Sequence, residues 1–390
     1  MLCHETLNFN MRNCILYITL LLFGCRPDVQ QTNIEVGELT PDSVYRVNTY
    51  GMFKESYWEG YAKTTIDGEN YLIGIDWMKN RIDVINLKKP NKSYPLSISS
   101  EGPNGIPDVK LSAIAKADTL FVLSRFFFYI CKIYPEQKEL KVIKSLSLTD
   151  TETSFNQSTV GIFYPNLPTF SMHNGSAVLP YYPRLSVRDT SFFNRDNFLV
   201  VDLESLSTIS HFVEWPLEYL YADETLFHPI NQKLFTLVVE NQVYISHPFT
   251  SLIRKTPINE RELGEVANWA EPLPEIDQLV RKENQNINDG LSPYTMVNDA
   301  KNAHFWPLQY NAIKARFYRV FLFPFGENDD TKRIREREKW LLEYDRDGRL
   351  VTKTLIPREF DMQPILLPDG AYGFPKSPTK EDFMEFAVYR

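Results

Sequence analysis

The fold of this chain is decided by the stretch Tyr71-Leu-Ile-Gly-Ile-Asp76, Trp77-Met-Lys-Asn80 and Arg81-Ile-Asp-Val-Ile-Asn-Leu87. Two short apolar runs, both rich in isoleucine, flank four polar or turn-forming residues, and a second turn signal, Lys88-Lys-Pro-Asn91, closes the unit. β-Branched and aromatic residues favour strands, whereas Pro and Asn favour turns. The stretch therefore predicts a β-hairpin that ends in a second turn.

The same unit recurs, so that six copies can be found along the chain. The expected strand pairs of the other copies are 119–124 with 129–134 and 140–148, 176–182 with 197–203, 234–240 with 242–246, 317–323 with 339–344, and 365–374 with 383–389. The second strands begin near 81, 129, 197, 242, 339 and 384, which gives spacings of 48, 68, 45, 97 and 45 residues by subtraction. Three of these spacings are close to the roughly 40–50 residues of one propeller blade.

Strands such as Phe317–Phe323 are apolar on both faces. A two-sheet sandwich would leave one face of such a strand in water, whereas stacked blades bury both faces. The sequence therefore predicts an all-β chain folded as a six-bladed β-propeller over residues 34–390. Residues 34–58 are expected to complete a terminal blade and close the ring, which removes exposed sheet edges.

Two segments between strands differ from the rest. Residues 259–311 are expected to form a small, partly helical insertion that caps one mouth of the propeller. Within it, Pro274–Glu283 has an initial Pro, early acidic residues and late basic residues, as a short helix should. The stretch Glu327–Lys339 holds five acidic and five basic residues and is expected to be a solvated hairpin tip.

The residues before the propeller have the pattern of a lipoprotein signal peptide. Met11-Arg12-Asn13 supplies a positive start, Cys14–Phe23 is a ten-residue apolar run, and Leu22-Phe23-Gly24-Cys25 resembles a lipobox. The run is far shorter than the roughly 20 residues that a membrane-spanning helix needs. We therefore expect a signal peptide over residues 1–25, lipidation of Cys25 and a tether over 26–33. Met11 is the expected start, with Met1 as the alternative.

Two other interpretations of this segment remain open: a buried helix of a cytosolic domain, and a simple secreted protein. Phe23 is larger than the residue usual at its position of a lipobox. The residues that follow Cys25 are polar and interrupted by Pro27, so the apolar run has no continuing helix to belong to. Arg26, in place of Asp, favours the outer membrane of the cell envelope as the site of the anchor.

Composition excludes some classes of function. The chain has 42 basic and 50 acidic residues and a net charge of −8. Interspersed charges of this sign argue against nucleic-acid binding, which needs a concentrated basic face. After removal of residues 1–25 and acylation of Cys25, Cys131 is the one remaining thiol, and its apolar neighbours predict an inert buried residue.

Together with the lipobox, two elements carry a family resemblance: Asp76…Asn80-Arg81-Ile82-Asp83-Val84 and Glu101-Gly-Pro-Asn-Gly105. The chain resembles the six-bladed propeller lipoproteins of Bacteroidetes-type bacteria, most nearly domain-of-unknown-function family 4221. The resemblance covers essentially the whole mature chain, and both elements are shared loosely with other NHL/TolB-like propellers. It implies an architecture and a place in the cell envelope, and it supplies no catalytic residue.

Standard catalytic signatures are absent from the sequence, including Cys-x-x-Cys, His-Glu-x-x-His, Gly-x-Ser-x-Gly and a phosphate-binding loop. Asp345-Arg-Asp-Gly348 resembles the start of a calcium loop, but Ile356 stands where a bidentate Glu is needed, which favours a plain turn. The five histidines of the mature chain show no metal-ligand spacing and are His173, His211, His228, His247 and His304. We therefore predict no catalytic, metal or cofactor-binding residues.

Two sets of residues keep alternatives open. Propeller enzymes of the lactonase type gather Asp, Asn and Glu around a central calcium ion, and residues of these types lie near expected inner strands at Asp76, Asp118, Asn174 and Asp369. Turns are rich in the same types. Four tryptophans could stack on sugars or peptides, or else pack between blades: Trp58, Trp77, Trp269 and Trp306.

The sequence thus favours a non-enzymatic cell-envelope lipoprotein, held at the membrane by acylated Cys25, whose β-propeller binds a protein or glycan ligand. The alternative is a metal-dependent hydrolase or lyase of the propeller lactonase type, which would act at the central mouth.

Overall fold

The computed structural model describes residues 35–38, 40–48, 60–76, 80–107, 110–124, 127–148, 170–180, 194–215, 234–248, 250–278, 303–323, 338–358, 360, 364–367, 369–375 and 383–390. Residues 35–390 form one compact unit, and residues 1–34 lie outside the described part of the chain. Within the described residues, no helix has the length and apolar character needed to cross a membrane.

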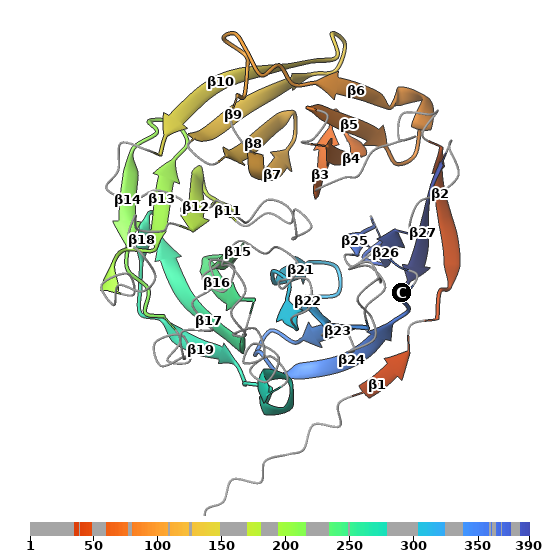
Figure 1. Cartoon of the computed structure of the whole chain (residues 1–390), viewed down its shortest axis with the longest axis vertical. Helices are drawn as coiled ribbons and strands as arrows, with labels where there is room; N and C mark the ends of the chain where they lie inside the picture. Colours follow the sequence, from red (N-terminus) through yellow and green to blue (C-terminus); the bar gives the residue numbers. More distant parts are fainter. Residues whose placement is uncertain are drawn as a thin grey trace, which may run out of the picture. The chain divides into compact units, whose positions relative to one another are not determined.

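Six small sheets follow one another around a ring and form a six-bladed β-propeller, which confirms the predicted fold (Figure 1). The first blade consists of β3 (Gly60–Ile66), β4 (Glu69–Asp76), β5 (Arg81–Asn86) and β6 (Tyr94–Ser97), with the 3-10 helix η1 (Pro90–Lys92) before β6. The second consists of β7 (Lys110–Lys116), β8 (Thr119–Ser124), β9 (Phe127–Tyr134) and β10 (Glu139–Ser147). The third consists of β11 (Ser171–His173), β12 (Ser176–Pro180), β13 (Phe198–Asp202) and β14 (Thr208–His211).

The last three blades are less regular. The fourth consists of β15 (Phe235–Val239), β16 (Gln242–His247), β17 (Thr250–Asn259), β18 (Glu262–Leu263) and β19 (Ala267–Ala270). The fifth consists of β20 (His304–Phe305), β21 (Gln309–Asn311), β22 (Arg316–Leu322), β23 (Lys339–Tyr344), β24 (Leu350–Ile356) and β1 (Glu35–Glu38). The sixth consists of β25 (Ile365–Leu366), β26 (Tyr372–Pro375), β27 (Phe383–Tyr389) and β2 (Ser43–Asn48).

The two ends of the propeller unit meet in the sixth blade. Strand β2 pairs with β27 in antiparallel register, with Ser43 opposite Val388 and Asn48 opposite Phe383. The prediction that residues 34–58 complete a terminal blade is confirmed for β2. Strand β1, which was not predicted separately, pairs in parallel with β24 at the outer edge of blade five.

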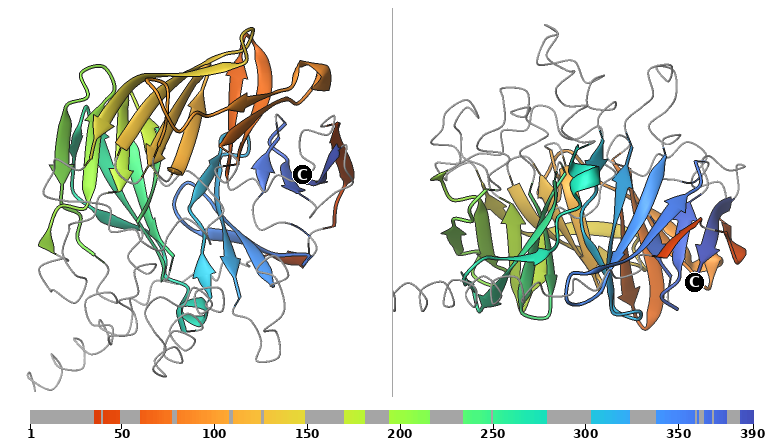
Figure 2. Two further views of the ribbon diagram at one scale, coloured as in Figure 1. Left: turned by 45° about the horizontal axis from the view of Figure 1, so that its top comes forward. Right: turned by 90° about the horizontal axis from the view of Figure 1, so that it is seen from below.

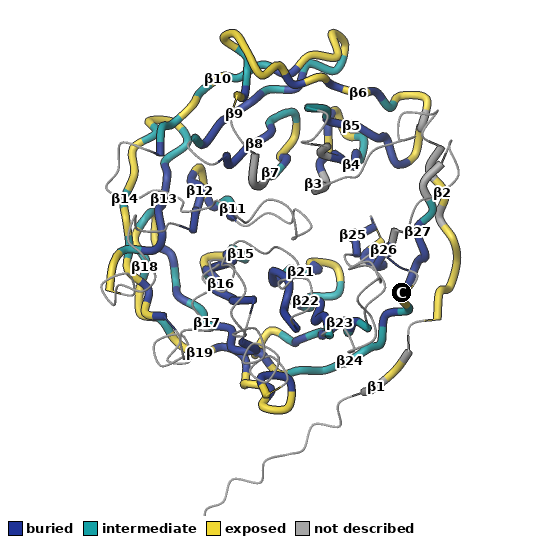
Figure 3. The backbone as a smooth tube through the Cα atoms, viewed as in Figure 1, coloured by how far each residue is buried: buried dark blue, intermediate teal, exposed yellow. Residues whose placement is uncertain are grey.

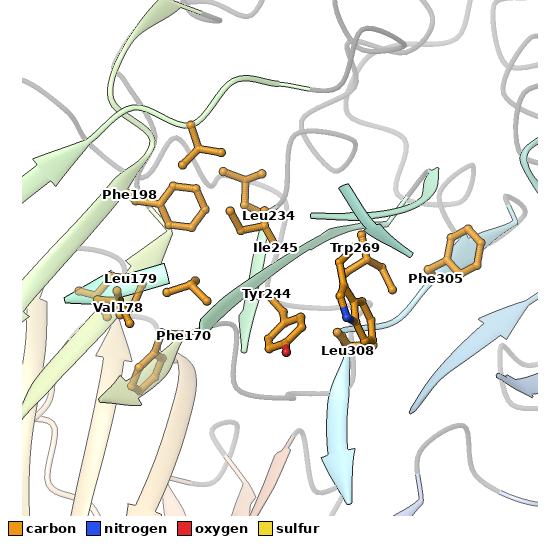
Figure 4. Packing of buried hydrophobic residues seen from close by; sticks show 14 of the residues in the cluster. Phe170, Val178, Leu179, Phe198, Leu234, Tyr244, Ile245, Trp269, Phe305 and Leu308 are labelled. Atoms are coloured by element: carbon orange, nitrogen blue, oxygen red, sulfur yellow. The ribbon is translucent and has the colours of Figure 1, made fainter. Parts of the chain in front are cut away.

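The hydrophobic core consists of layers between neighbouring blades, as the strands with two apolar faces predict. One layer joins blades one and two, a second joins five and six, and a third runs through blades two to five. A fourth closes the ring by packing Leu72 and Ile85 of blade one with Phe386 and Val388 of blade six. Figure 3 shows buried residues along the blades and more exposed ones on the outer strands. Figure 4 shows part of the third layer, including Tyr244, Trp269 and Phe305.

Cys131 lies within the layer between blades one and two. Its side chain is fully buried, and burial raises the pKa of its thiol to about 12. A thiol with so high a pKa carries almost no thiolate at neutral pH, and the thiolate is the reactive form. The prediction that Cys131 is buried is confirmed, and the raised pKa agrees with a thiol of low reactivity.

Both ends of the segment 259–311 are built into blades four and five. Strands β18 and β19 pair with β17, and β20 and β21 pair with β22. The stretch that lies between blades four and five is 271–303, which is shorter than the predicted insertion. Within it, residues 274–278 are helical, and the described residues end there until 303. Most of the charged stretch 327–339 lies outside the described residues. Its last residue, Lys339, is fully buried in blade five and not at a solvated tip.

Candidate functional site: the connection face

The two faces of the ring differ in how their strands are joined. At one face, which we call the hairpin face, each inner hairpin closes in a tight turn that contains a residue with positive φ: Gly68, Ala117, Asn174, Glu240, Ala315 and Gly370. The outer hairpins close there as well, and the longest of these connections, 87–93, has seven residues. Asp345-Arg-Asp-Gly348 is one of these outer turns, because Asp345 accepts hydrogen bonds from the backbone N–H groups of Asp347 and Arg349.

At the opposite face, which we call the connection face, strands are joined within a blade and from one blade to the next. The connections 148–170, 181–197, 212–234, 271–303 and 323–338 all begin and end at this face, and the shortest of them has 16 residues. Connections of this length are uncommon in compact domains and usually carry function. The right-hand view of Figure 2 shows the short helix at Pro274 on the connection face and the carboxyl terminus on the hairpin face.

In several blades, hydrogen bonds hold the chain at the connection face where it leaves the fourth strand. In blade three, the Asn197 side chain donates to the carbonyl oxygen of Val213 at 2.6 Å and accepts from its N–H at 2.9 Å. In blade one, the N–H of Ile98 donates to the carbonyl oxygen of Asn80. In both blades, the residue just before the third strand is hydrogen-bonded to a residue just after the fourth strand.

Blade five repeats this arrangement with a charged side chain. The Lys339 ammonium group donates to the carbonyl oxygen of Phe360 at 2.6 Å and lies 3.5 Å from that of Arg358. The Phe360 ring is itself buried between blades five and six, where it contacts Phe374 and Tyr389. The connection that leaves β24 is therefore held by its backbone and by its aromatic side chain.

Blade four uses a buried carboxylate for the same purpose. Asp277, at the start of the 271–303 connection, accepts from the N–H and from the hydroxyl of Ser251, both at 2.6 Å. The Ser251 hydroxyl in turn accepts from the N–H of Leu273 at 2.6 Å. Both polar residues are at least nine-tenths buried, so these bonds hold the first turn of the connection against β17.

Arg319, on β22, joins this network from blade five. It is almost completely buried, with 1% of its surface exposed. One of its Nη atoms donates to the carbonyl oxygen of Ser251, and its Nε donates to the hydroxyl of Tyr344 at 3.2 Å. The guanidinium group also lies over the Phe305 ring, 4.0 Å from the centroid. Arg319 and Asp277 thus place opposite charges on the two sides of Ser251.

The electrostatic surroundings of this network are those of a protein interior. Burial raises the pKa of Tyr344, and the positive charge of nearby Arg319 opposes that shift. The second Nη atom of Arg319 and the hydroxyl of Ser246 are buried and have no hydrogen-bond partner among the described residues. The arrangement can clamp backbone and exclude water, and it presents no acid–base pair in contact with solvent.

Of the four residues considered for a central calcium site, Asp118, Asn174 and Asp369 lie in turns and are held by hydrogen bonds or ion pairs, and Asp76 is the last residue of β4. Asp118 pairs with Lys132 at 3.1 Å, and the Asn174 amide contacts His173 at 3.2 Å. Asp369 accepts from the N–H of Ala371, which lowers the pKa of that carboxyl, and it also pairs with Arg390. The side chain of Asp76 lies outside the described residues. No three His, Cys, Asp or Glu side chains of the described residues form a group that could hold a metal ion.

The described histidines and tryptophans are mostly inside the protein. His173, His247 and His304 are buried, and His211 lies 2.8 Å from the carbonyl oxygen of Arg261. Trp269 is buried and donates to the carbonyl oxygen of Arg346, and Trp306 is 1% exposed. Packing between blades, and not sugar stacking, is therefore the role of these two tryptophans. His228, Trp58, Trp77 and the lipidation candidate Cys25 lie outside the described residues.

Sequence reasoning missed Arg319 and Lys339. Arg319 interrupts an otherwise apolar strand, Phe317–Phe323, and that interruption is the signal by which it could have been found. Lys339 has no such signal, because it directly follows a run of charged residues.

Comparisons with known proteins agree with this architecture. The family model described as Domain of unknown function (DUF4221) matches residues 34–351. No curated protein matches the chain. A crystal structure of a DUF4221 member from Bacteroides vulgatus is similar with a TM-score of 0.58 and 12% identity, and the match covers 90% of this chain and 98% of that one.

More distant propellers are also similar. The calcium-binding protein regucalcin from Agrobacterium tumefaciens has a TM-score of 0.45 and 10% identity, with 91% of this chain and 95% of that chain covered. The N-terminal domain of Nup159 has a TM-score of 0.43 and 10% identity, with 88% and 80% covered. Likenesses as distant as these concern the propeller fold and carry no argument about activity.

Proposed function

We propose that this chain, which belongs to the DUF4221 family, is a non-enzymatic cell-envelope lipoprotein whose β-propeller binds a protein or glycan ligand. Binding is assigned to the connection face. The observation that carries the proposal is the difference between the two faces of the ring. Short turns occupy the hairpin face, whereas long connections and hydrogen-bonded strand ends occupy the connection face.

Connections whose first residues are held by hydrogen bonds suit a recognition surface. A binding site needs side chains held by a rigid support, because ordering them at the moment of binding reduces the affinity. Asn197, Ser251 and Lys339 provide that support in three neighbouring blades, since each one holds the backbone of the connection that leaves its own blade. The same bonds supply no nucleophile or general base, which is why we favour binding over catalysis.

The membrane anchor rests on the sequence before the propeller. The apolar run Cys14–Phe23 and the following Gly24-Cys25 are typical of a lipoprotein signal peptide. Stable attachment to a membrane needs two or more acyl chains, which the amino-terminal cysteine of a lipoprotein carries. Arg26 favours the outer membrane as the destination.

Site-specific crosslinking in cells tests the binding face. A photo-crosslinking residue in place of Glu101 reports on the connection face, and the same residue in place of Glu136 reports on the hairpin face; both positions are exposed. We expect a discrete protein or glycan adduct, identified by mass spectrometry, from position 101 and none from position 136. Adducts from position 136 alone would contradict the assignment of the binding face.

Elemental analysis of the protein purified from native membranes tests the alternative function. Stoichiometric calcium or zinc without a bound partner would overturn the binding proposal in favour of a metal-dependent hydrolase or lyase. A stoichiometric partner without metal would support the proposal.

A further inference from the structure

We infer that the hairpin face is turned toward the lipid headgroups of the membrane, so that the connection face points away from them. This inference rests on the lipid anchor at Cys25 proposed above. It goes further by naming the surface of the propeller that meets the membrane and the surface that is left free for a ligand.

The first argument is the direction of β1. Strand β24 leaves the outer turn 345–349 at the hairpin face and ends with Ile356 at the connection face. Strand β1 runs parallel to it, with Glu35 opposite Thr352 and Glu38 opposite Leu355. The first described residue therefore lies nearer the hairpin face, and the strand runs away from that face.

The second argument is the length of chain before β1. Nine residues, 26–34, separate Cys25 from Glu35. Even when fully extended, they span about 30 Å. A membrane on the hairpin side can be reached along the direction that β1 already has. A membrane on the connection side would use about 13 Å of that length to pass alongside β24 from Thr352 to Ile356.

The third argument is the charge of the hairpin face. Although the chain has a net charge of −8, several acidic side chains on this face are paired with cations. The pairs are Glu69 with Lys89 and Lys92, Glu240 with Arg346, Asp347 with Arg349, and Asp369 and Asp42 with Arg390. Anionic headgroups repel unpaired carboxylates and attract lysine and arginine. These pairs reduce the repulsion between the hairpin face and a lipid surface, although Asp67, Glu136, Glu204 and Glu260 lie exposed in other turns of the same face.

The basic side chains are most concentrated in the turn 87–93 of blade one. It carries Lys88, Lys89 and Lys92, all exposed, against the single carboxylate of Glu69. Lys89 and Lys92 are each about half exposed, so their ammonium groups can contact headgroup phosphates while they remain near Glu69.

Energy transfer from a dye on the protein to acceptors in the headgroup layer tests the orientation. The mature chain, beginning at Cys25, is coupled through that thiol to a maleimide lipid in vesicles of phosphatidylcholine and phosphatidylglycerol. Cys131 is fully buried and does not compete for the maleimide. A donor dye is placed on a clickable residue that replaces either Glu136 on the hairpin face or Glu101 on the connection face.

We expect a higher transfer efficiency from position 136 than from position 101. Equal efficiencies, or a higher efficiency from position 101, would overturn the inference. A matched variant carries a flexible Gly/Ser segment of about 20 residues between Ile34 and Glu35, which lengthens the reach of the tether. We expect this variant to show a smaller difference between the two dyes, and an undiminished difference would contradict the role given to β1.

The coupling is chemical, so the result does not depend on acylation in cells. An unacylated Cys25 in cells would contradict the proposed function, whereas the energy-transfer result decides the orientation alone.

Discussion

The ammonium group of Lys339 lies 2.6 Å from the backbone carbonyl oxygen of Phe360, in the interior of the protein. Lysine is almost never fully buried unless it is paired. Here the amine holds the start of the connection from blade five to blade six, and the Phe360 ring fills the layer beside it. A charged group is thus used to fix the backbone where the chain passes from blade five to blade six.

Replacing Lys339 with Met keeps most of the side-chain volume but removes the donor. The carbonyl oxygen of Phe360 then loses a buried hydrogen bond, and we expect the free energy of unfolding to fall by about 2 kcal/mol. Urea denaturation measures this change. Lys116→Met, at an exposed position of β7, is the matched control and should change stability by no more than about 0.5 kcal/mol. Equal effects of the two variants would contradict the clamp.

Replacing Arg319 with Met tests the link between blades four and five. The substitution leaves the carbonyl oxygen of Ser251 and the hydroxyl of Tyr344 without their charged donor, and it removes the positive charge near buried Asp277. Removal of one partner from a buried ionic network costs about 3 kcal/mol. Arg346→Met, on the exposed outer turn, should leave the urea midpoint unchanged within error. A stable Arg319→Met protein would show that the network contributes little.

Much of the fold could be predicted from sequence because each blade repeats a local signal. Runs such as 71–76 and 119–124 combine strand-forming residues with turns, and they fall on β4 and β8. Strand β1 carries no such signal. Its sequence, Glu-Val-Gly-Glu, has one apolar residue, and its pairing with β24 depends on where the ring places the two segments.

The buried cations could not be predicted for a related reason. Lys339 ends a stretch of charged residues, and composition alone favours a solvated surface for such a stretch. Its burial follows from its place at the first residue of β23, where the strand has already entered the layer between blades. Burial of a charge is decided by tertiary partners, and those partners, Arg358 and Phe360, are about 20 residues away in sequence.

Alanine substitutions at two glycines with similar backbone conformations distinguish the cost of a steric collision from the cost of conformational strain. Gly348 and Gly68 both have positive φ, at 84° and 77°. A Cβ atom at position 348 would collide with the backbone carbonyl of Trp269, whereas nothing lies within 4 Å of a Cβ atom at position 68. We expect Gly68→Ala to cost about 1 kcal/mol and Gly348→Ala clearly more, because only the second must also displace blade four. Equal losses in urea unfolding would contradict the close packing of the 345–349 turn on Trp269.

The pH dependence of stability tests the ion pairs of blade one. Hydrogen bonds from Lys89, Asn86 and Lys92 lower the pKa of Glu69 from 4.5 to about 2. Because the pKa is lower in the folded state, the contribution of this group is complete above pH 4.5 and is lost as the pH falls toward 2. The melting-temperature difference between wild type and Glu69→Gln should therefore shrink over that interval. A difference that stays constant with pH would show that Glu69 acts through packing.

The mass of the amino-terminal peptide, from protein purified out of native membranes, tests the central claim most directly. We predict that the mature chain begins at Cys25 and that this residue carries the added mass of its acyl chains, while Cys25→Ser moves the protein to the soluble fraction. A chain that begins upstream of Cys25, or an unmodified Cys25 in membrane-bound protein, would contradict the account of a lipid-anchored propeller.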